Sequence, residues 1–229
     1  EHKRSTVNLF ADHTFKLMDN KLMISPGIAF SYFSDLSFHS FPGIDLGYNL
    51  NSNFKLYSNI GKTYRIPTYT DLYYSDTTTI GNENLNPESA ISTEFGVKYD
   101  TSNVKFTASF FNRNAKNIID YAKENEEDLW KAVNIGSLNS NGYEFDFSYS
   151  FKSSNTLSSA NSISIGYTKI KDNNYVSNIN FSRYSLNSLK HHLASNLNLN
   201  YTRNINHSIV YKYAERSDKS NYRVLDSKI

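Results

Sequence analysis

The side chains that most often perform chemistry in proteins are few in this 229-residue chain, and they are scattered along it. The chain has no cysteine and six histidines. Only His191 and His192 are adjacent, and neighbouring side chains of a strand point to opposite faces, so these two cannot bind one metal ion together. There is no nucleophile motif, phosphate-binding loop or paired-carboxylate motif. The sequence therefore predicts no catalytic residue, no metal site and no cofactor.

One acidic run offers oxygen ligands for a hard cation such as Ca²⁺, and it is Glu124-Asn125-Glu126-Glu127-Asp128. Calcium loops space their ligands along a longer segment with a glycine at the turn. This run has consecutive acids and no such spacing, so we interpret it as a solvated loop.

The composition excludes several classes of protein. The mean hydropathy is −0.57, and no segment approaches the ~18 apolar residues of a spanning helix. The formal net charge is only +2 and the basic residues are not clustered, so the chain lacks the electrostatic footprint of a nucleic-acid-binding protein. The unusual feature is the abundance of aromatic residues, with eighteen tyrosines and fifteen phenylalanines. Their spacing along the chain indicates which kind of structure they belong to.

The aromatic residues follow a period of two, which is the period of a β-strand. Between Tyr143 and Phe151 every odd position is aromatic and every even position is polar. A strand would therefore carry an apolar face and a polar face. Similar segments predict ten strands and the start of an eleventh near Tyr222: 5–17, 22–33, 43–50, 54–64, 91–99, 104–113, 137–151, 157–170, 188–202 and 206–214.

The connections between these strands alternate between short and long. The short ones are expected at 18–21, 51–53, 100–103, 152–156 and 203–206, and the long ones at 34–42, 65–90, 114–136, 171–187 and 215–221. Transmembrane β-barrels have short periplasmic turns and longer extracellular loops. The sequence thus predicts an antiparallel transmembrane β-barrel whose first strand runs toward the periplasm, in contact with outer-membrane lipid.

One long connection carries motifs in a fixed order. They are Arg65-Ile66-Pro67-Thr68, Asp71-Leu72-Tyr73, Gly81-Asn82-Glu83-Asn84-Leu85-Asn86-Pro87-Glu88 and Glu94-Phe95-Gly96, followed by Asn117-Ile118-Ile119, Asn134-Ile135-Gly136 and Gly142-Tyr143-Glu144. This order resembles the barrel signature of TonB-dependent receptors, in the vitamin B12 and siderophore receptor branch. The resemblance is strong over residues 55–151, and only the strand pattern extends it to the flanks.

The resemblance implies a 22-stranded barrel in the bacterial outer membrane, plugged by an N-terminal domain that contacts TonB. Residues 1–229 would supply ten or eleven of those strands, and the plug is not in this sequence. The chain stops at Ile229 just after a new strand has begun, without a terminal aromatic residue. We therefore expect it to be part of a larger barrel, with TonB a partner only through the absent plug domain.

The resemblance also implies a function, namely the uptake of a scarce, bulky small-molecule ligand such as a corrinoid or a ferric siderophore. Candidate ligand-binding residues lie in the predicted extracellular loops: Phe38, His39, Arg65, Tyr69, Tyr73 and Tyr74. For Arg65 and Glu88 an alternative is fold maintenance, in which they hold a long loop against the rim of the barrel. Arg65 is also the candidate basic partner of the signature glutamates.

Two other functions remain open for a barrel of this kind. An outer-membrane protease or phospholipase would need catalytic residues clustered at the rim, and the sequence offers none clearly. A non-transporting barrel could serve in adhesion or in a surface complex. Ligand uptake that depends on TonB would distinguish the receptor from both.

Overall fold

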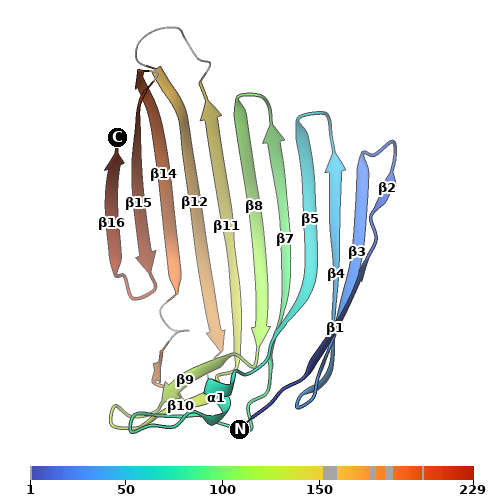
Figure 1. Ribbon diagram of the computed structural model, residues 1–229, viewed down its shortest axis with the longest axis vertical. Helices are drawn as coiled ribbons and strands as arrows, with labels where there is room; N and C mark the ends of the chain where they lie inside the picture. Colours follow the sequence, from blue (N-terminus) through green and yellow to red (C-terminus); the bar gives the residue numbers. More distant parts are fainter. Residues whose placement is uncertain (1, 152–158, 176–178, 184–187, 203) are drawn as a thin grey trace.

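The computed structural model describes residues 2–151, 159–175, 179–183, 188–202 and 204–229, and it is built almost entirely of β-strands (Figure 1). The predicted turn at 152–156, the first residues of the strand predicted at 157–170, most of 176–187 and Arg203 lie outside these described ranges. One sheet follows the order β1-β3-β4-β5-β7-β8-β11-β12-β14-β15-β16, with β2 pairing with β3.

All neighbouring strands of this main sheet are antiparallel. The strands are β1 (Thr6–Asp12), β2 (Phe15–Leu17), β3 (Leu22–Phe33), β4 (Ser37–Asn49), β5 (Phe54–Arg65), β7 (Glu88–Asp100), β8 (Val104–Lys116), β11 (Ser137–Ser150), β12 (Ser159–Tyr175), β14 (Leu189–Thr202), β15 (Ile205–Arg216) and β16 (Asn221–Lys228). The prediction of ten strands with an eleventh near Tyr222 is confirmed, with the first one divided into β1 and β2.

The two faces of the sheet have the predicted polarity. Residues directly opposite each other share a face, and the register places Phe95 of β7 beside Phe110 of β8, which lies beside Tyr143 of β11. These three side chains are 58%, 49% and 54% exposed. We call this apolar side the outer face. The opposite, inner face carries polar side chains such as Glu94 and Asn59, which are hydrogen-bonded to each other.

The strict alternation of short and long connections was wrong at two places. The connection predicted at 34–42 is only three residues long, because β4 begins at Ser37. Pro42, the last residue of the predicted connection, lies inside β4 opposite Ile28, and β4 pairs with β5 only from Gly43 onward. Because β5 does not pair with β4 at Pro42, the missing N–H of this proline costs no hydrogen bond to β5. The connection predicted at 215–221 is likewise short, because β15 continues to Arg216 and β16 starts at Asn221.

A second, four-stranded sheet lies at the end of the main sheet where the long connections meet (Figure 1). Its order is β13-β9-β10-β6, from β13 (Phe181–Ser182), β9 (Ile119–Lys123), β10 (Trp130–Asn134) and β6 (Thr79–Ile80), and the helix α1 (Tyr69–Tyr73) lies beside it. The sequence did not predict these elements. Within the described ranges, no helix has the length and apolar character needed to cross a membrane.

Three connections of the main sheet build this second sheet together. The β5–β7 connection supplies α1 and β6, the β8–β11 connection supplies β9 and β10, and the β12–β14 connection supplies β13. Its small core contains Leu72, Leu85, Ile119, Tyr121 and Ala132, with Trp130 packed against it. The long connections are therefore one folded unit, which we call the loop cap.

Candidate functional site

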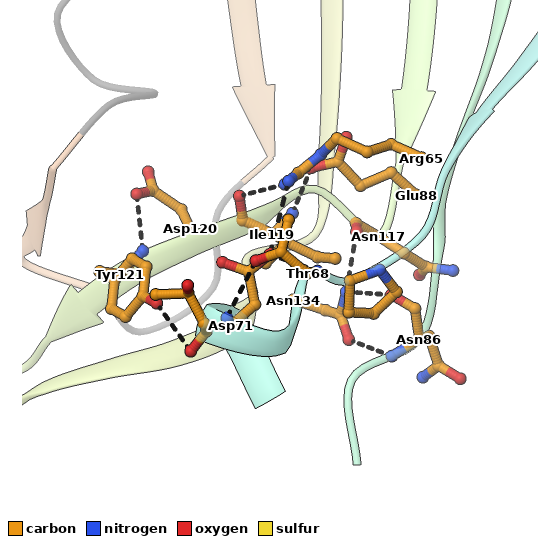
Figure 2. Close-up of polar contacts among 12 residues, drawn as sticks. Arg65, Thr68, Asp71, Asn86, Glu88, Asn117, Ile119, Asp120, Tyr121 and Asn134 are labelled. Atoms are coloured by element: carbon orange, nitrogen blue, oxygen red, sulfur yellow. Dashed lines mark hydrogen bonds and ion pairs between the residues drawn. The ribbon is translucent and has the colours of Figure 1, made fainter. Parts of the chain in front are cut away.

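An ion pair joins the loop cap to the end of the main sheet (Figure 2). Arg65 is the last residue of β5 and Glu88 the first of β7, and they are direct register partners. Nη2 of Arg65 donates to Oε1 of Glu88 at 2.7 Å and to the carbonyl oxygen of Ile119 at 3.2 Å. The same Glu88 oxygen accepts the Ile119 N–H at 2.7 Å. The predicted pairing of Arg65 with a signature glutamate is confirmed. This ion pair also binds the backbone of Ile119, the first residue of β9.

The short helix α1 is fixed by its cap and by the same arginine. The Thr68 hydroxyl accepts the Asp71 N–H at 3.1 Å, while the Asp71 carboxylate accepts the Thr68 N–H at 2.9 Å. This is a capping box, in which each residue satisfies a backbone donor of the other. Nη1 of Arg65 also lies 3.5 Å from Oδ2 of Asp71. Asp71 is buried, and its carboxylate is stabilised there by the hydrogen bond of the cap and by the Arg65 guanidinium.

Removing the cap hydroxyl should loosen α1. Thr68→Ala should cost about 1 kcal/mol, as N-cap deletions usually do. The Leu72 amide donates to the Thr68 carbonyl, and we expect its hydrogen exchange to accelerate about fivefold. Mass spectrometry of the peptide that spans 68–74 would measure the rate. Thr68→Ser keeps the hydroxyl and should exchange like the wild type, and equal rates in the two variants would contradict the role of the cap.

An asparagine clamp closes the other side of the loop cap. Nδ2 of Asn134 donates to the carbonyl oxygens of Asn86 and Asn117, both at 2.8 Å, and its Oδ1 accepts the Asn86 N–H at 2.8 Å. Asn117 has a φ of 54° and Gly136 a φ of 104°. Left-handed backbone at these two positions favours asparagine and glycine, which explains why both residue types occur in the signature.

The predicted aromatic residues Tyr69 and Tyr73 lie on α1 and contact the beginning of the chain. The ring of His2 stacks on that of Tyr73 with centroids 3.6 Å apart, and the guanidinium of Arg4 lies 5.3 Å from the centroid of Tyr69. Nε of Arg4 donates to Asp35 at 2.8 and 2.9 Å. Hydrogen bonding from Arg4 lowers the pKa of the Asp35 carboxyl. Both tyrosines remain part-exposed, at 40% and 36%.

The structure separates Phe38 from His39. Both were expected in a loop and that placement was wrong, because they are neighbouring residues of β4 and so point to opposite faces. Phe38 is on the outer face, where its ring lies 5.5 Å from that of Phe30. Nε2 of His39 is 2.8 Å from the Tyr64 hydroxyl oxygen, and this contact lies where β4 and β5 have ceased to pair. The two residues cannot contact one ligand on the inner face.

Tyr74 follows α1 and belongs to a turn organised by Asp76. The Asp76 carboxylate accepts the Tyr74 hydroxyl at 2.8 Å and the N–H groups of Thr78 and Thr79, both at 2.7 Å. The hydrogen bond from the Thr78 backbone is the largest of several that lower the pKa of Asp76 to about 2.

This turn should open in acid. A carboxyl with a lowered pKa stabilises the folded turn above its ordinary pKa near 4, and that contribution is lost as the pH falls toward 2. Pepsin cleavage within 74–80, relative to the denatured protein, should therefore rise between pH 4 and pH 2. Asp76→Asn should be cleaved readily throughout this range, and a pH profile like that of the wild type in this variant would contradict the assignment.

A stacked arginine in the loop cap was not predicted from the sequence. The Arg183 guanidinium carbon lies 4.8 Å from the centroid of Trp130 and 5.4 Å from that of Tyr121, and Arg183 donates to Oγ1 of Thr79 at 3.2 Å. The single tryptophan of the chain is the one signal that could have marked this region, but its arginine partner lies in another connection. These contacts join β13 to β6, β9 and β10.

A cavity of about 460 Å³ opens beside the same strands. Its lining includes Lys123, Asp128, Leu129, Lys131 and Val133. The acidic run is a turn in which Oδ2 of Asp128 accepts the Asn125 N–H at 2.9 Å. Among the residues that the structure describes, no group of three or more histidine, aspartate or glutamate side chains is arranged to hold a metal ion.

Comparison with known proteins gives one family and a consistent set of structural neighbours. The family described as "TonB dependent receptor-like, beta-barrel" matches residues 1–226. The vitamin B12 transporter BtuB of Vibrio vulnificus (strain YJ016) is 26% identical over 108 residues, which are 47% of this chain and 17% of that protein. The match thus spans less than a fifth of this curated relative's length.

The solved structures support the same fold at low sequence identity. The siderophore receptor PirA of Pseudomonas aeruginosa superposes with a TM-score of 0.74 at 16% identity, over 99% of this chain and 40% of that one. The ferric yersiniabactin uptake receptor FyuA of Yersinia pestis gives a TM-score of 0.70 at 18% identity, over 98% and 37% of the two chains. The copper transporter OprC gives 0.72 at 11% identity, over 97% and 39%.

Proposed function

Because the chain belongs to the TonB-dependent receptor-like β-barrel family, we propose that it forms part of the wall and outer mouth of an importer energised through TonB. The family places the chain in a β-barrel of the bacterial outer membrane. The proposed cargo is a scarce, bulky small molecule such as a corrinoid or a ferric siderophore. The observation that carries the proposal is the family match over nearly the whole chain.

The arrangement of the two faces supports this role. Exposed aromatic side chains on the outer face suit lipid, and the hydrogen-bonded polar side chains of the inner face suit an aqueous or plugged lumen. We further propose that the loop-cap end is extracellular, since barrels of this type keep their longer connections outside. On this orientation β1 runs toward the periplasm.

We propose that the edge strands β1 and β16 pair with further strands of a larger barrel of about 22, with a plug domain inside it that contacts TonB. A strand edge in a membrane leaves backbone donors and acceptors unpaired, and closure of the barrel satisfies them. The neighbouring receptors are longer, and this chain matches 40% of PirA.

Ligand contact is proposed for the part-exposed residues of the loop cap and its rim. Tyr69 and Tyr73 offer aromatic faces, and Arg65 and His39 offer polar atoms on adjoining strands. Tyr74 is exposed beside them. Phe38 belongs to the same set of proposed ligand residues, but its position on the outer face restricts it to a ligand that approaches from outside the wall.

Uptake in a host without its own receptors would test the function. The full-length protein should import radiolabelled cobalamin or a ⁵⁵Fe-labelled siderophore, and deletion of TonB should reduce that import to background. Import that persists without TonB would overturn the proposal, and so would a failure to import any member of either class. Surface expression must be equal in the two strains, which antibody labelling of intact cells would verify.

A further inference from the structure

Residues 2–4, which lead into β1, lie against the helix α1 (Figure 1). The ring of His2 is nearly parallel to that of Tyr73, with 7° between their planes and 3.6 Å between their centroids. This distance is that of atoms in van der Waals contact, so no other ring fits between them. The guanidinium carbon of Arg4 lies 5.3 Å from the centroid of Tyr69, within the range of a cation–π contact. We call residues 2–4 the strap, because they cover aromatic surface of α1.

Arg4 fastens the strap at a second point. Its Nε donates to both carboxylate oxygens of Asp35, at 2.9 and 2.8 Å, and its Nη2 lies 2.8 Å from Oδ2 of Asp35. Its Nη1 donates to the carbonyl oxygen of Pro67, just before α1, at 3.1 Å. The side chain of Arg4 is only 12% exposed and that of Asp35 is 34% exposed. The pair of Arg4 and Asp35, which we call the latch, therefore joins the strap to the β3–β4 turn beside α1.

The strap can open without any change in the main sheet. Pairing of β1 with β3 begins only at Thr6. Ser5 anchors the chain just before that pairing, because its N–H donates to Oγ of Ser34 at 3.1 Å and its carbonyl oxygen accepts the Ser34 N–H at 3.0 Å. The strap instead contacts α1 and the latch carboxylate through side chains. Segments held by a few contacts at the surface open more readily than the strands of a sheet, so Ser5 is the expected hinge.

We propose that the strap is an internal competitor of the cargo, which covers the faces of Tyr69 and Tyr73 in the empty receptor and is displaced when cargo binds. The inference rests on the proposed function, since it presumes that these two tyrosines contact cargo. A site that is open for only part of the time binds with an affinity reduced by that fraction. The strap therefore selects cargo with a planar ring, which replaces the stacking that His2 gives up on Tyr73.

Trypsin treatment of the purified full-length protein in neutral detergent reports the position of the strap. Trypsin cleaves after Lys3, and this bond should resist cleavage while the neighbouring Arg4 is held in the latch. Asp35→Asn removes the charge of the latch but keeps its shape, and loss of an ion pair of this exposure changes a population by about fivefold. Cleavage after Lys3, followed by mass spectrometry, should therefore accelerate about fivefold in Asp35→Asn and also in Arg4→Ala.

Cargo should have the same effect as opening the latch. The probes are cobalamin and a ferric tricatecholate siderophore, which both carry planar rings, each added at saturating concentration. A ligand that simply contacted the strap would protect it from trypsin. Displacement predicts the opposite sign, so a bound probe should accelerate cleavage after Lys3 at least fivefold in the wild type. The same probe should have little further effect in Asp35→Asn, in which the strap is already released.

Opening the strap should also tighten cargo binding by the same factor. The dissociation constant of the bound probe should fall about fivefold in both Asp35→Asn and Arg4→Ala, because the open fraction rises by that factor. Agreement between the two variants is required, since only Arg4→Ala removes a cation beside the tyrosines. His2→Ala removes the stacked ring alone and should tighten binding about threefold. It decides the question if a latch variant does not fold.

Arg223→Ala is the matched control. The Arg223 guanidinium carbon lies 5.7 Å from the ring centroid of Tyr213, so this variant removes a similar arginine–tyrosine contact from β15 and β16. Because these strands are remote from α1 (Figure 1), cleavage after Lys3 and probe binding should both stay within twofold of the wild type. Equal effects of Arg223→Ala and Arg4→Ala would show a general loss of stability and contradict the role of the strap.

Three further outcomes would overturn the proposal while leaving import intact. They are unchanged cleavage after Lys3 in both latch variants, protection of that bond by a bound probe, and equal probe affinities in the wild type and both latch variants. Failure of the proposed function gives a different result. Neither probe would then be bound or imported by the wild type or the latch variants, although the latch variants would still be cleaved faster, and the strap would lose its role as a competitor together with the function.

Discussion

Gly142→Ala is expected to lower the free energy of unfolding by about 3 kcal/mol, at the upper end of the usual cost of overpacking. A β-carbon at Gly142 would lie 2.1 Å from the Lys169 carbonyl oxygen and 2.7 Å from Cζ of Phe111. The first of these is backbone of the neighbouring strand, so β11 and β12 would have to separate. Urea unfolding followed by the circular dichroism of the β-sheet would measure the change.

A second glycine provides the control for this prediction. Gly61 also lies within a strand of the main sheet, but a β-carbon there would meet nothing within 4 Å. Gly61→Ala should therefore remain within about 0.5 kcal/mol of the wild type, as for substitutions in open positions. Equal unfolding midpoints for Gly142→Ala and Gly61→Ala would show that the close approach of Lys169 does not limit this position.

Arg65→Ala is expected to release the loop cap from the main sheet. The substitution removes both hydrogen bonds of the guanidinium and leaves the Glu88 and Asp71 carboxylates, whose side chains are 15% and 11% exposed, without their cation. Arg65 itself is 45% exposed, so we expect a cost of about 2 kcal/mol rather than the larger value of a fully buried pair. Hydrogen exchange of the Ile119 amide should accelerate about 30-fold.

A double-mutant cycle separates the ion pair from its surroundings. Glu88→Ala should also accelerate exchange at Ile119, and the double variant should cost less than the sum of the two single variants, because the residues interact directly. Arg113→Ala is the matched control, since Arg113 is on the same face and forms no ion pair with the rest of the described chain. Additive effects of Arg65→Ala and Glu88→Ala would contradict the coupling.

The strands of the main sheet could be predicted because their signal is local. Each crossing must present apolar residues to one side and polar residues to the other, so the period of two is written in about ten consecutive residues. The exception at β4 has a local cause as well. The predicted connection ended at Pro42, and only knowledge of where β5 diverges shows why proline is tolerated inside a strand there.

The loop cap could not be predicted in this way, because its pairing is between distant segments. In β9, four of the five residues are buried, so no alternation of apolar and polar positions reveals a strand. Its neighbours β6 and β13 contain two residues each. The signature motifs located Arg65 and Glu88 correctly, but the stacking of Arg183 on Trp130 joins residues 53 positions apart, and no spacing rule connects them.

The small sheet shared by three connections has a consequence for how such receptors diversify. Its strands come from the β5–β7, β8–β11 and β12–β14 connections, and each is hydrogen-bonded to a strand from another connection. A graft of a single connection from a relative would remove a pairing partner from at least one other connection, and a graft of the β8–β11 connection would remove one from both. We expect chimaeras to retain a folded outer mouth only when all three connections are transplanted together, so that new specificities are inherited as a set.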